Sequence, residues 1–238
     1  MSPDDPIAEA AYDELASDYA AAVETNPYNA FLEFPATSGL IPDVTGQCVL
    51  DAGCGSGHYT GWLLDQGARV VGADVSEAML AEARDRVGDR ADFHRADLAE
   101  PLPFEADSFD GIVSALALGY VRDWTATFAE FARVLRPGGW LVFSVKHPFD
   151  SFEAESGSDY FAVERETKEW AVDVPYYRRP LAAMVDPLLA NDFALDALVE
   201  PQPTDEFAEA APDLYEKEST HPVFLCIRAR RGDPADRD

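Results

Sequence analysis

Three acidic residues follow three consecutive apolar segments, and the first of them opens a glycine-rich turn. Asp51 ends the run Cys48–Leu50 and glycines stand at positions 53, 55 and 57 behind it, while Asp74 and Asp97 follow the next two segments. Glycine lets a backbone approach a ligand closely, and a helix that begins there offers free N–H groups. A carboxylate after the second segment can accept from the hydroxyl groups of a ribose. One after the third can accept from an exocyclic amino group, so we expect Asp74 and Asp97 to bind an adenine-like nucleoside.

Each acid also has a plainer interpretation. Asp74 precedes Ser76 closely, where it would simply cap the next helix, and Asp97 would be a solvated loop residue in so acidic a chain. The position of both acids behind a glycine turn favours ligand binding. The glycine spacing excludes two other nucleotide sites. A G-x-G-x-x-G motif would need glycine at position 58, which is His58, and no lysine follows the turn as it does in a P-loop.

Short apolar runs alternate with helical patterns from Gln47 onward. Such alternation predicts a doubly wound parallel sheet, which binds ligands beyond the carboxyl ends of its strands. The expected strands are Cys48–Leu50, Ala68–Ala73, Ala91–Ala96, Phe109–Ala115 and Trp140–Val145. The expected helices are Gly57–Gln66, Ser76–Val87 with Ser76 as its N-cap, and Trp124–Leu135, which Pro137-Gly138-Gly139 would close.

The flanking segments complete the expected single domain. Helical spacing predicts an amphipathic helix over Pro6–Val23, and prolines 27, 35 and 42 predict a loop-rich connector after it. The acidic segment 148–180 interrupts the alternation and is interpreted as a lid; its aromatic residues are Phe149, Phe152, Tyr160, Phe161, Trp170, Tyr176 and Tyr177. The remaining expected elements are a helix over Leu181–Ala190 and strands over Phe193–Val199 and Pro222–Ala229. The expected parts are a helical cap (1–46), a ligand-binding core (47–147), the lid (148–180) and a C-terminal helix with strands (181–230).

These motifs resemble the class I S-adenosylmethionine-dependent methyltransferases, particularly the small-molecule branch that includes ubiquinone and menaquinone biosynthesis enzymes. The match covers about Gln47–His147 and comprises Asp51–Gly57, Asp74–Leu80, Ala96–Leu98, Phe109–Val113 and Phe131–Leu141; Tyr12–Ala16 and Asp18-Tyr19 match the family's lead-in. The resemblance implies an α/β fold with a Rossmann-like, doubly wound seven-stranded sheet whose last strand is antiparallel. It also implies methyl transfer from S-adenosyl-L-methionine, with S-adenosyl-L-homocysteine as the product.

The resemblance assigns cofactor contacts by position. It implies that Gly53, Gly55 and Gly57 line the methionine part, that Asp51 orients the amino group and that Asp74 holds the ribose. The other implied contacts are Val75 or Met79 on adenine, Asp97 and Leu98 at the edge of the base, Ala115 and Leu116 behind the sulfonium, and Tyr12 or Tyr19 over the cofactor. One departure is Ser114–Leu118, which has no Asn-Pro-Pro-Tyr-like sequence. This disfavours the amino groups of adenine and glutamine as methyl acceptors.

Four further residues are candidates on the acceptor side. His147 follows the fifth strand and would take a proton from a hydroxyl nucleophile, although a histidine that only caps the loop is the alternative. Tyr177, Arg179 and Glu200 are expected to face the same pocket. The adjacent pair Arg178-Arg179 would also serve simply to offset nearby carboxylates. No His, Cys and Asp cluster has metal-ligand spacing, so no metal is expected.

The charge of the chain argues against other classes of partner. The chain has 45 acidic and 18 basic residues, which gives a formal net charge of −27, and its only lysines are Lys146, Lys168 and Lys217. Nucleic acids and anionic membranes need clustered cations, so neither is expected as a partner. Salt would screen the self-repulsion, which predicts a halophilic protein; an ordinary acidic protein is the alternative. Without a disulfide framework or a signal-peptide pattern, we expect a cytoplasmic monomer or homodimer.

The sequence as a whole therefore predicts in-line methyl transfer to a small-molecule acceptor. One alternative is a non-catalytic module that binds or senses S-adenosylmethionine or S-adenosylhomocysteine. Another is a nicotinamide oxidoreductase on the same sheet, which the missing glycine at position 58 disfavours. A large cavity beneath the lid would favour an enzyme, and a filled one would favour the binding module.

Overall fold

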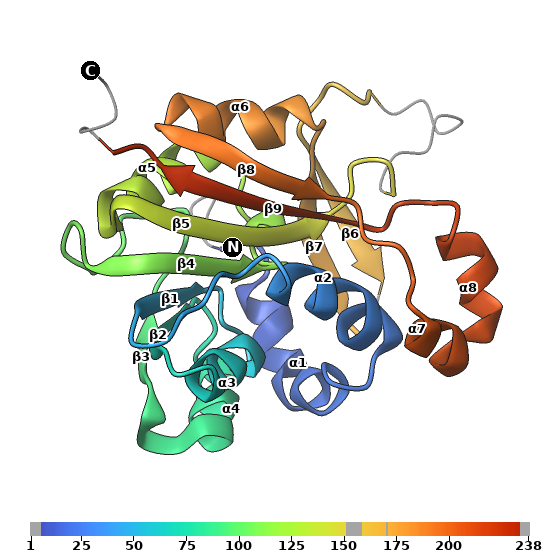
Figure 1. The fold of residues 1–238 in the computed structure, drawn as a ribbon. Helices are drawn as coiled ribbons and strands as arrows, with labels where there is room; N and C mark the ends of the chain where they lie inside the picture. The colour runs from blue at the N-terminus through green and yellow to red at the C-terminus, as the bar shows by residue number, and fades with distance from the viewer. Residues whose placement is uncertain (1–5, 151–158, 170, 234–238) are drawn as a thin grey trace.

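The computed structural model describes residues 6–150, 159–169 and 171–233, so the predicted lid residues Phe152 and Trp170 lie outside the described residues. A seven-stranded sheet crosses the molecule, with helices on both faces (Figure 1). The strands are β1 (Cys48–Ala52), β2 (Arg69–Asp74), β3 (Asp92–Arg95), β4 (Phe109–Ala115), β5 (Leu135–Lys146), β6 (Glu164–Glu169), β7 (Asp173–Arg178), β8 (Phe193–Val199) and β9 (Phe224–Arg231). The helices are α1 (Glu9–Ala22), α2 (Phe34–Ser38), α3 (His58–Asp65), α4 (Glu77–Val87), α5 (Trp124–Val134), α6 (Ala182–Ala190), α7 (Asp205–Ala210) and α8 (Pro212–Glu218).

The order of strands in the main sheet is β3-β2-β1-β4-β5-β9-β8. Strand β9 runs antiparallel to both of its neighbours, and the other pairs are parallel, which confirms the predicted sheet. Strand β1 pairs with β2 on one side and β4 on the other, so the winding reverses between β1 and β4. The carboxyl ends of β1, β2 and β4 therefore meet at one edge, where a sheet of this type binds ligands.

Alternate residues of the central strands are buried on opposite faces. Ile112 of β4 packs in a cluster with α5 and α6, whereas the next residue, Val113, packs in a cluster with α3. Leu141 and Val142 of β5 divide in the same way. Because both faces are covered, these strands appear in the sequence as continuous apolar runs rather than alternating ones.

Strand β5 begins earlier than the sequence predicts. It starts at Leu135 and includes Pro137-Gly138-Gly139, which we expected to close the preceding helix. The helix α5 ends instead at Val134, because Leu135 is already extended and pairs with Phe109 of β4. The pairing then shifts register between Phe109 and Gly111, so the glycines occupy an irregularity in the strand rather than a helix end.

Two segments outside the core are more helical than predicted. The proline-rich connector contains a π-helical turn over Asn29–Glu33 and then α2, with Pro35 in the first turn, where its missing N–H costs nothing. The short helices α7 and α8 follow β8, and the side chain of Thr204 caps α7 by accepting from the N–H of Phe207. Their brevity leaves no periodic apolar stripe that sequence reasoning would detect.

The predicted lid segment contains a separate two-stranded antiparallel hairpin of β6 and β7. Strand β7 contacts both α1 and the 3₁₀ turn Leu118–Tyr120, and α1 also packs along α4. The hairpin and α1 thus lie together at the ligand edge of the sheet (Figure 1). Among the described residues, no helix has the length and apolar character that crossing a membrane requires.

Candidate functional site

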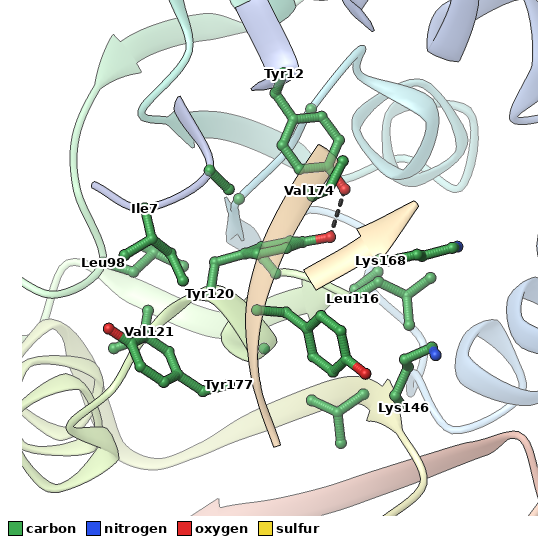
Figure 2. A pocket seen from close by; sticks show the side chains of 18 of the residues that line it. Ile7, Tyr12, Leu98, Leu116, Tyr120, Val121, Lys146, Lys168, Val174 and Tyr177 are labelled. Atoms are coloured by element: carbon green, nitrogen blue, oxygen red, sulfur yellow. Dashed lines mark hydrogen bonds between the residues drawn. The ribbon is translucent and has the colours of Figure 1, made fainter. Parts of the chain in front are cut away.

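A cavity of about 770 Å³ lies beyond the carboxyl ends of the parallel strands, and part of its lining is shown in Figure 2. Its walls come from the loops after β1 to β5, from α1, from the β6–β7 hairpin and from α8. It is lined by the predicted residues Tyr12, Tyr19, Gly53, Gly55, Asp74, Val75, Met79, Asp97, Leu98, Ala115, Leu116, Tyr177 and Arg179. The structure therefore brings most of the predicted site together. Asp51, Gly57, His147 and Glu200 are not among the residues that line this cavity.

The glycine turn after β1 approaches the cavity through two of its three glycines. Gly53 and Gly55 have left-handed backbone conformations, with φ of 77° and 51°. A Cβ atom on Gly53 would lie 2.2 Å from the Cβ of Ala117, so only glycine fits there. A Cβ atom on Gly55 would meet nothing closer than the ring of Tyr19, 4.0 Å away. The backbone of Gly55 therefore faces open space in which a ligand can lie against it.

Gly57 has a different position and does not line the cavity. It is the N-cap of α3, with φ of 78°. A Cβ atom there would lie 3.0 Å from the Cβ of Ala83 and 3.1 Å from its Cα. Its observed role is therefore to let α3 begin close against α4, not to face the cavity.

Asp51 is buried and lines a small cavity that adjoins the main one and shares Gly53 and Gly55 with it. Its Oδ2 accepts a 2.6 Å hydrogen bond from the hydroxyl of Thr60. Burial raises the pKa of Asp51 to about 7, and the nearby charge of Asp74 acts in the same direction. Asp51 can therefore hold a proton near neutrality, and a bound cationic group would drive that proton off.

The carboxylate of Asp74 links the glycine turn after β1 to the start of α4. Its Oδ2 accepts from the N–H of Gly55 at 2.8 Å, and its Oδ1 accepts from the N–H of Ser76 at 2.9 Å. Burial raises the pKa of Asp74, while these backbone hydrogen bonds oppose the rise. The capping role near Ser76 is thus real, and it coexists with a place in the cavity wall.

The predicted base-binding residues all line the cavity. Met79 and Leu98 are buried apolar side chains, and Val75 and Asp97 complete this part of the lining. The Oδ1 of Asp97 accepts a 2.9 Å hydrogen bond from the N–H of Ala99, which fixes the carboxylate at the start of its loop. An apolar slot with one acceptor at its rim can hold a flat heterocycle that carries an amino group.

Three tyrosines that contact one another line the cavity. Tyr12 of α1 and Tyr120 of the 3₁₀ turn share a hydrogen bond between their phenolic oxygens (Figure 2). Tyr12 also packs edge-to-face against Tyr19, with ring centroids 5.8 Å apart. Burial raises the pKa of all three phenols, so they remain neutral hydrogen-bonding groups. Sequence reasoning missed Tyr120, although its place just after the fourth strand was a usable signal.

Ala115 and Leu116 lie at the junction of the two cavities. Leu116 has an unusual positive φ of 54°. Its N–H donates to the backbone oxygen of Ser144 at 3.0 Å and to the Oγ of Ser144 at 3.1 Å. These contacts with β5 hold the end of β4 in this conformation, so the side chain of Leu116 lines both cavities.

His147 does not line the cavity, and both of its ring nitrogens contact other residues. Its Nε2 lies 2.8 Å from Oε1 of Glu200, and its Nδ1 accepts from the N–H of Phe149 at 3.1 Å. The N–H of His147 itself donates to Val223 of the neighbouring chain segment at 2.8 Å. Both ring nitrogens are used to hold the loop after β5, which is the alternative that we set against a catalytic base. Glu200 is explained by the same contact, in which the neutral ring donates its Nε2–H to the carboxylate.

The adjacent arginines have different surroundings. Arg178 is buried and paired with Glu164 and Glu166 of β6, so it offsets carboxylates as the alternative interpretation held. Arg179 is also buried, but its guanidinium stacks on Trp124, 4.2 Å from the ring centroid. It donates to the backbone oxygens of Val121 and Arg122 and lines the cavity. Tyr177 lines it as well.

Comparison with known proteins agrees with this geometry. A family profile described as "Methyltransferase domain" matches residues 50–143, which span the glycine turn to β5. The crystal structure of an S-adenosylmethionine-dependent methyltransferase from Mesorhizobium loti is 32% identical in sequence, with a TM-score of 0.70 over 84% of this chain and 97% of that one.

The chain belongs to the class I S-adenosylmethionine-dependent methyltransferases. The cofactor of this family is S-adenosylmethionine, as the resemblance implied. A ubiquinone biosynthesis O-methyltransferase of Hahella chejuensis is 34% identical over 161 residues, or 65% of this chain and 66% of the relative. A biotin biosynthesis bifunctional protein of Teredinibacter turnerae is 32% identical over 151 residues, which are 58% of this chain and 26% of that protein. This methyltransferase chain thus spans between a quarter and two thirds of the length of these curated relatives.

Proposed function

We propose that this protein transfers the methyl group of S-adenosylmethionine to a small-molecule acceptor by in-line displacement. One observation carries the proposal: a single cavity is lined by most of the residues expected to hold the cofactor and by further residues beyond them. Its further lining includes Lys146, Lys168 and Tyr176, none of which was expected to contact the cofactor. The additional space is where an acceptor would lie.

The proposed cofactor position follows the lining. The adenine would lie between Val75, Met79 and Leu98, with Asp97 accepting from its amino group. The ribose hydroxyls would donate to Asp74, whose two oxygens each keep room for a second hydrogen bond besides the backbone amides. The open face of Gly55 fits the methionine part, because no side chain fills that space. Asp51 would then face the amino group.

S-adenosylmethionine, when bound, supplies a methyl group on an activated sulfonium. The residues of the chain would position the two reactants and exclude water. Tyr12, Tyr19 and Tyr120 form a partly buried aromatic cluster in the cavity wall, and Leu116 would form the wall next to the acceptor space. His147 lies outside this lining, so we do not assign it the role of a base.

The non-catalytic alternative is less well supported. A module that only senses the cofactor needs no second compartment, whereas this cavity extends beyond the cofactor residues. A nicotinamide oxidoreductase is disfavoured by His58 at the position of the third glycine and by the family to which the chain belongs.

Calorimetry and a transfer assay together test the proposal. S-adenosylhomocysteine should bind, and NAD should not bind at about 1 mM, which corresponds to roughly 4 kcal/mol of binding free energy. Incubation with S-adenosylmethionine labelled in the methyl group and a panel of small hydroxyl, amine and carboxylate compounds should yield a labelled product. Absence of S-adenosylhomocysteine binding would overturn the proposal. Tight binding without transfer to any fraction of a metabolite extract would favour the sensing module.

A further inference from the structure

All three lysines of the chain line the same cavity. Lys146 is the last residue of β5, Lys168 belongs to β6 and Lys217 belongs to α8. The formal net charge is −27, and the lining takes up a minor part of the chain. The other fifteen basic residues are arginines, so every lysine of the chain lines the proposed active site.

Two of these lysines act on each other electrostatically. Partial burial lowers the pKa of Lys168, and the like charge of Lys146 lowers it further, whereas Asp150 opposes the change. Lys146 lies 3.1 Å from the carboxylate of Asp150 and 5.4 Å from the centre of the Tyr176 ring. Figure 2 shows both lysines near Leu116, on the far side of the Tyr12–Tyr120 hydrogen bond from Leu98. They therefore lie at the end proposed for the acceptor, away from the adenine end.

Bringing two ammonium groups together costs free energy that a neutral pair would not. The carboxylate of Asp150 pairs with Lys146 and also acts on Lys168, so these three groups together keep one net positive charge. The same cavity is lined by Arg179, which is buried and forms no ion pair with a carboxylate among the described residues. A bound anion would stabilise this arrangement, since ammonium and guanidinium groups form strong charge-assisted hydrogen bonds with carboxylates and phosphates.

We infer that the methyl acceptor carries an anionic group, a carboxylate or a phosphate, which binds between Lys146 and Lys168 while its nucleophilic atom faces the sulfonium. This inference rests on the proposed function, because it names the substrate class of that same site. It differs from a general surface effect, since salt adaptation alone would not place two of the three lysines of the chain at this end of the cavity, beside a single acidic partner of Lys146 within the described part of the chain, Asp150. The anionic group would anchor one end of the acceptor in the cavity, with Lys146 and Lys168 as the residues that bind it.

Nuclear magnetic resonance of lysine side chains gives a direct test, because the whole chain contains three of them. The protein is labelled with ¹³C and ¹⁵N in lysine, saturated with S-adenosylhomocysteine, and titrated with malonate or with inorganic phosphate. Sodium chloride at matched ionic strength is the control. The Lys146 and Lys168 signals should shift with a saturable curve for at least one probe and not for chloride. The preferred probe distinguishes a carboxylate from a phosphate.

Matched variants assign the site. Lys146→Gln and Lys168→Gln should each weaken binding of the preferred anion about tenfold or more, as expected for loss of a charge-assisted hydrogen bond. Lys217→Gln should have a smaller effect, because its ammonium pairs with Glu218 and its side chain is two-thirds exposed (66%). Absence of a saturable shift with both probes, or equal weakening by all three variants, would overturn the inference. Calorimetry with S-adenosylhomocysteine on the same samples tests the proposed function separately, since neither Lys146 nor Lys168 is among the residues assigned to the cofactor.

Discussion

The N–H of Gly55 donates a 2.8 Å hydrogen bond to Oδ2 of Asp74, so the turn after β1 is tied to the end of β2. The other oxygen of the same carboxylate accepts from Ser76, at the start of α4. Asp74 thus fixes the backbone that would cradle the methionine part of the cofactor, while its carboxylate lines the cavity at the proposed ribose position. We therefore expect a change at Asp74 to act on both the proposed cofactor contact and the loop geometry.

Asp74→Ala should weaken binding of S-adenosylhomocysteine by tenfold or more, about 1.4 kcal/mol. It should also lower the free energy of unfolding by about 1–3 kcal/mol, because two backbone amides lose their acceptor. Asp43→Ala is the matched control, since Asp43 accepts from the N–H of Thr45 in an exposed turn far from the cavity. Calorimetry and urea unfolding measure the two effects. An unaltered affinity in Asp74→Ala would remove the ribose assignment.

Gly57→Ala should destabilise the protein more than Gly46→Ala. Both glycines have positive φ, 78° and 74°, so alanine strains the backbone by about 1–2 kcal/mol at either position. At Gly57 the added methyl group also meets Ala83 at 3.0 Å, whereas at Gly46 it meets nothing within 4 Å. Overpacking adds about 1–3 kcal/mol. Equal losses in urea unfolding would contradict the packing role that the structure gives to Gly57.

The affinity for S-adenosylhomocysteine should rise with pH and level off above about pH 7. Burial raises the pKa of Asp51 to about 7, so the free protein holds a proton there in mildly acidic solution. A bound ammonium group would lower that pKa, and binding would therefore release a proton. Calorimetry in buffers of different ionisation enthalpy counts the proton released.

Two variants at this position provide the controls. Asp51→Asn should abolish the proton release. Thr60→Val should increase it near pH 7, because the Thr60 hydrogen bond lowers the pKa of Asp51. If Asp51→Asn released as many protons as the parent, another group would be responsible and the amino-group assignment of Asp51 would fail.

His147→Ala should lower stability and change turnover little. Burial lowers the pKa of His147, although Glu200 opposes the shift, so the unfolded chain takes up a proton more readily than the folded one. The stabilisation by the neutral ring is therefore present above about pH 6.5 and is lost as the pH falls. The difference in unfolding free energy between parent and variant should shrink between about pH 7.5 and pH 5. A turnover loss of tenfold or more without loss of stability would restore the catalytic base.

The sheet, and the meeting of most of the proposed cofactor residues in one cavity, were predictable for a simple physical reason. Val49 and Leu50 face opposite sides of the sheet and both are buried, so the strand appears as an apolar run that ends in Asp51. The carboxyl ends of neighbouring parallel strands share one edge, which brings Asp74 and Asp97 to the same cavity even though the loops differ.

Of the proposed acceptor end, only the presence of Tyr177 and Arg179 in the cavity lining was predicted, because the rest depends on contacts between distant segments. Tyr12 meets Tyr120 across 108 positions of sequence, and Lys168 enters from a hairpin outside the main sheet. His147 was expected beside the methyl group because it follows a parallel strand. Val223, just before the antiparallel neighbour β9, accepts the N–H of His147 through its backbone oxygen, and Glu200 contacts the imidazole ring.

The confinement of lysine to the cavity also affects how this protein is handled. Reagents that couple to side-chain amines, such as activated esters used for fluorescent labels or for attachment to sensor surfaces, meet only Lys146, Lys168 and Lys217. Coupling through thiols is also unfavourable, since Cys54 and Cys226 are buried and Cys48 is partly buried. Random amine coupling would therefore modify the ligand cavity itself, and a chemical handle for this chain has to be introduced on its carboxylate-rich exterior.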